Sequence, residues 1–163
     1  MKNLIIDFDK YYINQADPNF ANIQFKNKAT IHSYGCGVCC ASMIICSLLK
    51  LTSTADKQDV IKKVIADATN SEGLLTYSNI NYRGCVFKFE KIKDLALLLL
   101  GNEPGICRLN GHFVLINGYD LSKKDYEAYL IKDPGAAANS NLRQPMKKYG
   151  IAIKDKIALR LEK

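Results

Sequence analysis

Three stretches of the chain have the spacing of apolar and polar residues that predicts helices. Residues 36–50 form a long apolar, helix-competent run, which predicts a buried helix. A second helix is expected over the amphipathic stretch ADKQDVIKKVIADA, with Ser53 or Thr54 as its cap. A third helix is expected within KIKDLALLLLG, ending at Gly101.

Other apolar segments are typical of strands. CVFKF predicts one strand before the third helix, and four more are expected from Ile106 onward, in ICRLN, HFVLINGYD, EAYLIKDP and IAIKDKIALRLE. Residues 70–84 are expected to form a loop with space for a short helix. Because helices come first and an antiparallel sheet second, the order predicts an α+β fold with N-terminal helices packed on a C-terminal sheet.

Length and composition fit one domain over residues 1–163. The chain is 48% hydrophobic, enough to bury a core. No transmembrane segment is expected, because MIICSLLKL and LALLLL are both too short to span a bilayer. The N-terminal apolar patch is interrupted by Asp7 and Asp9, so no signal peptide is expected and the protein is predicted to be cytoplasmic as synthesised.

The net charge of +7 bears on possible partners. An anionic polymer such as a bacterial wall would attract such a surface, although a solvated lysine-rich face is the plainer interpretation. Aromatic residues are not interleaved with the basic ones, so no nucleic-acid partner is expected. Basic residues alternate with apolar ones in the C-terminal segment, as on a solvated strand face: Arg143, Lys147, Lys148, Lys154, Lys156, Arg160 and Lys163.

Cys36 is the candidate nucleophile. It lies between two glycines at the start of the apolar helix, in YGCGVCCASM. Glycines allow a tight turn and a close approach of the backbone to a ligand. The positive end of the helix dipole favours a thiolate at this position. Cysteine is also a common buried residue, and Cys39, Cys40 and Cys46 on the same helix are expected to be core residues.

Only two histidines are available as the base. His32 lies in a polar segment that predicts a loop, whereas His112 begins a strand with alternating side chains. A base on a rigid strand is the better choice. A hairpin centred between Lys123 and Lys124 would bring Asp133 or its neighbours opposite His112. Asp120 would lie roughly 26 Å along the strand from His112, too far to orient it.

Four segments together resemble the papain-like cysteine peptidases related to the bacteriocin-leader (double-glycine) peptidases. They are INQADPNF, YGCGVCCASM, GHFVLINGYD and IKDPG, in that order. The resemblance implies a papain-like fold, with Cys36 as nucleophile, His112 as base and Asp133 as the carboxylate that orients the imidazole. It also implies that the side-chain amide of Gln15 joins the backbone N–H of Cys36 in the oxyanion hole.

The six cysteines do not predict disulfides, because four crowd one helix and the other two lie in or beside expected strands. The Cys36-x-x-Cys39 spacing fits a redox motif, but the strand that precedes such a motif in thioredoxin-like proteins is missing here. A zinc site would need a second ligand cluster, and the sequence has none. No metal or cofactor is therefore expected.

Three classes of function fit these residues. The first is a cysteine hydrolase that cleaves a peptide or amide bond through a thioester, with a peptidoglycan stem peptide as its preferred substrate in a phage or bacterial cell-wall lysin, which would act on the wall after release. Processing of a double-glycine leader peptide is the second substrate option. A non-catalytic binding module and a thiol redox protein are the other classes. The host, the oligomeric state and the bond cut do not follow from the sequence.

Overall fold

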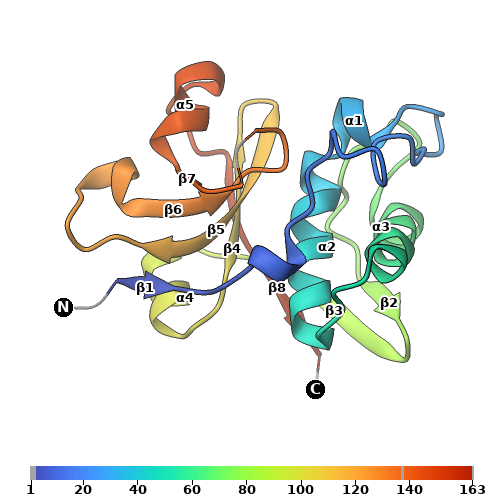
Figure 1. Cartoon of the computed structure of the whole chain (residues 1–163), viewed down its shortest axis with the longest axis horizontal. Coiled ribbons are helices and arrows are strands. Elements are labelled where there is room, and N and C mark those ends of the chain that lie inside the picture. Colours follow the sequence, from blue (N-terminus) through green and yellow to red (C-terminus); the bar gives the residue numbers. More distant parts are fainter. Residues whose placement is uncertain (1–2, 137, 163) are drawn as a thin grey trace.

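The computed structural model describes residues 3–136 and 138–162. Over these residues, five α-helices and an eight-stranded antiparallel sheet form an α+β fold, the class that the sequence predicts (Figure 1). The helices are α1 (Ile31–Tyr34), α2 (Cys36–Leu49), α3 (Thr54–Ala68), α4 (Leu95–Leu100) and α5 (Arg143–Tyr149), with short 3-10 turns η1 (Asp9–Tyr11) and η2 (Asp125–Ala128). The strands are β1 (Leu4–Ile5), β2 (Ile80–Tyr82), β3 (Cys85–Lys91), β4 (Gly105–Leu109), β5 (His112–Tyr119), β6 (Tyr129–Lys132), β7 (Ser140–Asn141) and β8 (Asp155–Leu161).

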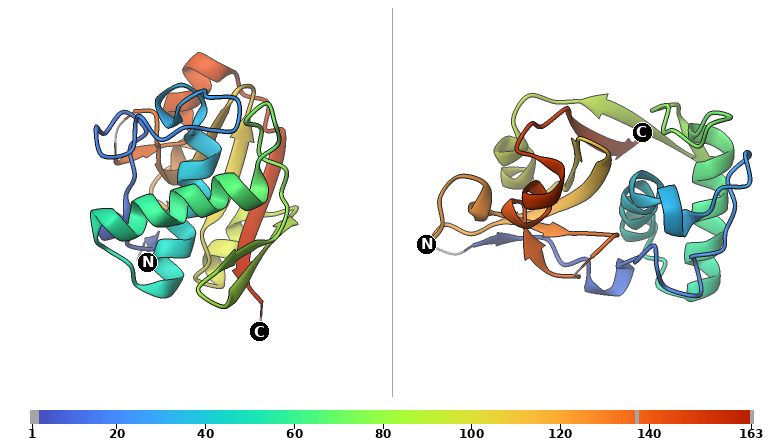
Figure 2. Two further views of the ribbon diagram at one scale, coloured as in Figure 1. Left: turned by 90° about the vertical axis from the view of Figure 1, so that its right-hand side faces the viewer. Right: turned by 90° about the horizontal axis from the view of Figure 1, so that it is seen from above.

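The sheet separates two layers of helices. Its strand order is β2-β3-β8-β4-β5-β6-β7, and β1 pairs with the far end of β5. Helices α2 and α3 cover one face, as Figures 1 and 2 show, and their side chains form one buried cluster with that face. Helices α4 and α5 supply a second cluster on the other face. The expectation of N-terminal helices on a sheet therefore holds for α2 and α3, whereas α4 and α5 are interleaved with strands.

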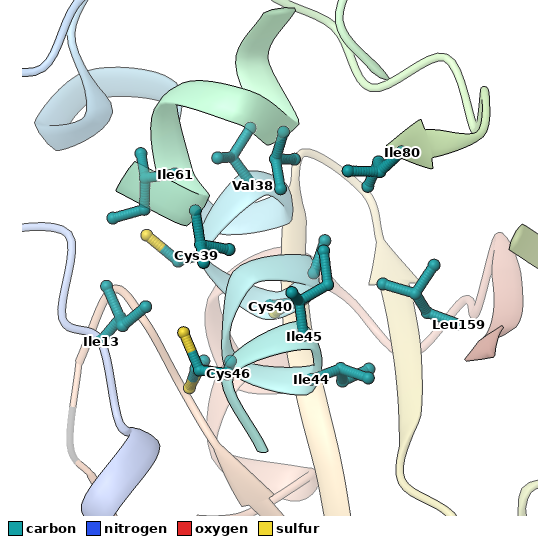
Figure 3. Close-up of a cluster of buried hydrophobic side chains, with 14 of the residues drawn as sticks. Ile13, Val38, Cys39, Cys40, Ile44, Ile45, Cys46, Ile61, Ile80 and Leu159 are labelled. Carbon is teal, nitrogen blue, oxygen red and sulfur yellow. The ribbon is translucent and has the colours of Figure 1, made fainter. Parts of the chain in front are cut away.

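Helix α2 is the centre of the larger cluster. Ten consecutive residues from Gly37 to Cys46 are buried, which is why its sequence is apolar on nearly every side. The second helix begins at Thr54, and the Ser53 side chain accepts a hydrogen bond from the Asp56 N–H, so the predicted cap is confirmed. The side chains around α2 come from α3, β2 and β8 as well (Figure 3): Ile13, Val38, Cys39, Cys40, Ile44, Ile45, Cys46, Ile61, Ile80 and Leu159.

Several expected elements differ in extent. Strand β3 continues to Lys91, and the Asp94 side chain accepts from the Ala96 N–H, so the third helix begins only at Leu95. The loop over 70–84 contains no helix; its end forms β2, which pairs with β3. The last strand begins at Asp155, four residues later than expected.

The basic C-terminal segment is only partly a strand face. Arg143, Lys147 and Lys148 lie on α5, which the alternating pattern did not predict. Pro145 and Met146 of that helix are buried against the sheet, so tertiary packing decides this segment. Lys163 lies outside the described residues. None of the described helices has both the length and the apolar character needed to cross a membrane.

Candidate active site

Cys36 is the first residue of α2 and is half-buried. The preceding turn, α1, occupies a segment that the sequence predicts to be a loop. A side chain at Gly35 would lie 2.4 Å from the Ile31 carbonyl oxygen, so the close contact between α1 and α2 requires glycine. Neither Gly35 nor Gly37 has a positive φ. The glycines beside Cys36 therefore serve helix packing rather than a left-handed turn.

His112 begins β5, as predicted, and its ring is bonded to Asp133. The His112 Nε2 and Asp133 Oδ1 atoms are 2.7 Å apart, and both residues are buried. Strands β5 and β6 pair Leu115 with Lys132 and Ile116 with Ile131, the register that the expected hairpin centre gives. Asp120 instead accepts hydrogen bonds from Ser122.

The loop after β6 holds Asp133 in place. The Gly135 N–H donates to Asp133 Oδ1 at 2.8 Å, and a side chain at Gly135 would lie 3.0 Å from the His112 ring. From the N-terminal segment, the Tyr12 hydroxyl donates to the Asp133 carbonyl at 2.6 Å, and the Gln15 N–H donates to the Pro134 carbonyl at 2.8 Å. Two segments more than a hundred residues apart in the sequence thus fix one carboxylate.

The electrostatics of the site favour an imidazolium. Burial lowers the pKa of His112, but hydrogen bonds and charge interactions with Asp133 and Cys36 raise it overall to about 9. Because Nε2 is bonded to Asp133, Nδ1 is the ring nitrogen available to Cys36. The arrangement is that of an imidazole held between a carboxylate and a thiol.

Tyr149, the last residue of α5, stacks on the His112 ring. The ring centroids are 4.4 Å apart and the rings are inclined by only 17°. Tyr149 therefore packs on one face of the imidazole that is bonded to Asp133, restricting the rotation of the ring. No sequence pattern predicts this role, because the contact joins the start of β5 to the end of α5, which are distant in the chain.

A cleft of about 1000 Å³ contains the reactive side of the site. Cys36, His112, Gln15 and Tyr149 line it. Asp133 does not; it lines a smaller cavity together with His112 and Tyr149. His32 reaches the cleft as well, but its side chain is exposed and bonds to no other described residue. His112 is thus the histidine with a carboxylate partner.

Gln15 lies at the edge of this cleft. Its Nε2 donates to the His32 carbonyl at 2.7 Å and to the Ile31 carbonyl at 3.4 Å. The second contact is at the long limit for a hydrogen bond, so the amide keeps donor capacity for a ligand. The buried Oε1 atom has no partner among the described residues.

Four of the other five cysteines are buried, unlike Cys36. All six are free thiols. Cys39 and Cys40 are fully buried, and burial raises the pKa of both thiols, as it raises the pKa of Cys46 and Cys107 to about 12. Within residues 3–136 and 138–162, no three side chains of His, Cys, Asp or Glu come together in a way that would hold a metal ion.

Lys132 is a further buried group that sequence reasoning missed. Its ammonium, beside Asp133 in the chain, bonds to Asp9 of η1 and to Asn139. It ties the N-terminal segment to the loop that carries Asp133.

Comparison with family models, with curated proteins and with solved structures gave no match to this chain, so the resemblance to papain-like peptidases stays a prediction.

Proposed function

We propose that the protein is a papain-like cysteine hydrolase that cleaves a peptide or amide bond through a thioester. The observation that carries this proposal is the buried 2.7 Å bond between His112 and Asp133, with the imidazole and Cys36 lining one cleft. A structural histidine needs one partner, whereas this ring is held between a carboxylate and a thiol at a helix N-terminus.

In the first half of the reaction, the sulfur of Cys36 attacks the carbonyl carbon of the substrate. The carbonyl oxygen becomes an oxyanion, which the backbone N–H of Cys36 and the side-chain amide of Gln15 stabilise. When the intermediate collapses, the carbon–nitrogen bond breaks and the His112 imidazolium gives its proton to the leaving amine. A thioester on Cys36 remains.

In the second half, His112 acts as a base. It takes a proton from water, whose oxygen attacks the thioester carbon. Collapse of this second intermediate releases a carboxylic acid and returns the proton to the Cys36–His112 pair. Asp133 does not exchange a proton; it holds the ring and stabilises its charged form.

The substrate proposed is the stem peptide of peptidoglycan, as for a cell-wall lysin. The support is the net charge of +7, which raises the local concentration of the enzyme on an anionic mesh. This attraction is screened over about 10 Å at 0.1 M salt. Lysis should therefore weaken as salt is added.

The test incubates the purified protein with Gram-positive cell walls and, separately, with a synthetic double-glycine leader peptide. Cys36→Ala is the matched blank in both arms. New amino or carboxyl ends in soluble wall fragments support the lysin. Cleavage of the leader with intact walls assigns the chain to leader processing instead. If neither is cleaved in a Cys36-dependent way, the hydrolase proposal fails and a binding module or a redox thiol protein takes its place.

A further inference from the structure

A charged cluster lies in the same cleft as the proposed catalytic residues, and the reaction uses none of it. Arg108, on β4, directs Nε to Asp155 Oδ2 at 2.7 Å, and the Tyr77 hydroxyl donates to the same oxygen at 3.1 Å. Lys91 Nζ lies 3.4 Å from Asp155 Oδ1. All four residues line the cleft.

The register of the sheet places this cluster on the face of the sheet that packs against α2, the helix of the proposed nucleophile. Arg108 is directly opposite Phe113 on β5, so the two side chains share a face, and the Phe113 ring lies against Gly37, the residue after Cys36. His112 precedes Phe113 and points to the other face, but it lines the same cleft at the end of the strand. Opposed Cα atoms are about 5 Å apart and consecutive ones 3.8 Å, so the backbones of Arg108 and His112 are within roughly 9 Å. An extended peptide covers that distance in about three residues.

The cluster has one more positive charge than negative. Although burial raises the pKa of Asp155, hydrogen bonds from Arg108, Tyr77 and Lys91 lower it overall, so the carboxyl is ionised. This one carboxylate, only 11% exposed, faces two cations. Apart from the Cys36–His112 pair, the other charged side chains that line the cleft are Glu72 and Lys148, which have opposite signs.

Arg108 also has unused donors. Only its Nε atom is bonded within the described residues, while the side chain is 39% exposed. Asp155 fixes the guanidinium through Nε and leaves both Nη groups without a partner there. Terminal guanidinium groups held in one plane are suited to a carboxylate, which they bind with two parallel hydrogen bonds.

We propose that Arg108, supported by Asp155, binds a free carboxylate of the substrate within about three residues of the bond that is cut. This inference rests on the hydrolase function proposed above and adds the class of substrate: an acidic peptide. The carboxylate comes either from an Asp or Glu side chain of a linear peptide or from a free carboxyl of a wall stem peptide. Both present the same planar anion to the guanidinium.

The experiment compares kcat/KM for pairs of synthetic heptapeptides that carry Glu or Gln at each position in turn. A parallel arm compares wall stem peptides with free and with amidated carboxyl groups. The wild-type protein should prefer the charged member of one pair by roughly ten- to a hundredfold, the range for a charge-assisted hydrogen bond. The arm in which the preference occurs identifies the source of the carboxylate.

Arg108→Gln should bring that ratio to about one. Arg160→Gln is the matched control, because Arg160 lies on the same sheet, is 40% exposed and bonds to Glu103, but does not line the cleft. It should keep the wild-type ratio. If Arg108→Gln is unstable because Asp155 loses a partner, the double variant with Asp155→Asn removes the buried charge and should also give a ratio near one.

Two results would overturn the inference alone: equal cleavage of charged and neutral substrates by the wild type, or a preference that persists in Arg108→Gln. In both cases Cys36-dependent cleavage continues and the hydrolase function stands. If the wild type cleaves none of these substrates, the hydrolase function fails and the inference fails with it.

Discussion

Replacing Asp133 by asparagine tests how far one carboxylate controls the charge of the site. The side chains of His112 and Asp133 are 5% and 6% exposed, so solvent screens their interaction little. Burial lowers the pKa of His112, whereas Asp133 and Cys36 raise it from 6.5 to about 9. That difference corresponds to about 3 kcal/mol in favour of the imidazolium.

Asp133→Asn keeps the shape of the side chain and removes its charge. With the carboxylate gone and burial unchanged, the pKa of His112 should fall from about 9 to nearer 6.5. The assay is NMR titration of protein labelled with ¹³C at histidine Cε1. The chain has only two histidines, so two signals are expected, and a His112→Gln variant assigns them.

The same substitution should change how stability depends on pH. A pKa raised on folding stabilises the protein fully below about pH 6.5, and this stabilisation is lost as the pH rises through about 9. In urea unfolding, the free energy of unfolding of the wild type should therefore exceed that of Asp133→Asn by up to about 3 kcal/mol at pH 6. This contribution of the imidazolium should vanish by about pH 10.

Two observations would refute this reasoning. One is a His112 signal that titrates near pH 6.5 in the wild type. The other is a titration that is the same in Asp133→Asn as in the wild type, which would mean that the 2.7 Å contact does not stabilise the charged ring.

Three further predictions concern other residues of the site. Iodoacetamide at mildly acidic pH should label Cys36 well before Cys85, which is also half-buried but has no histidine partner; mass mapping that finds Cys85 first contradicts the assignment. Tyr149→Ala should lower kcat/KM roughly three- to tenfold through loss of the stacked ring, and Tyr149→Phe should restore it; equal effects of both would mean that the hydroxyl matters instead. Gln15→Ala should lower kcat by roughly 10²–10³ with little change in KM, and a rise in KM alone would assign Gln15 to substrate binding.

The parts of the site that the sequence predicts are those fixed by local physics. The start of α2 at Cys36 follows from a continuous apolar run, and the start of α3 from the cap at Ser53. His112 at the start of β5 follows from side-chain alternation. In each case, neighbours in the chain supply the information, so spacing alone is sufficient.

The parts that it does not predict depend on contacts between distant segments. The seven-residue helix α5 is stabilised by burying Pro145 and Met146 rather than by its own propensity, and only this packing brings Tyr149 onto His112. In the sequence, Arg108 is an ordinary polar position within a strand segment. Its place in the cleft depends on the pairing of β4 with β5 and β8. Such pairings are properties of the whole sheet.

The pairing of His112 with Asp133 depends both on the position of the hairpin between β5 and β6 and on a β-bulge in β5. Near the connection, Gly118 pairs with Leu130, whereas Ile116 pairs with Ile131, so Asn117 is an extra residue on β5. Without this bulge, every pair farther from the connection would slip by one residue. The side chains of β6 would then face the opposite side of the sheet from the β5 side chains that they now meet. Asn117 is held in the bulge from outside the hairpin. Its side-chain amide donates to the Ile6 carbonyl at 3.0 Å, and its backbone carbonyl accepts from the Ile6 N–H. The expected hairpin centre thus gave the right register only because the N-terminal segment stabilises a bulge that no pattern in β5 predicts.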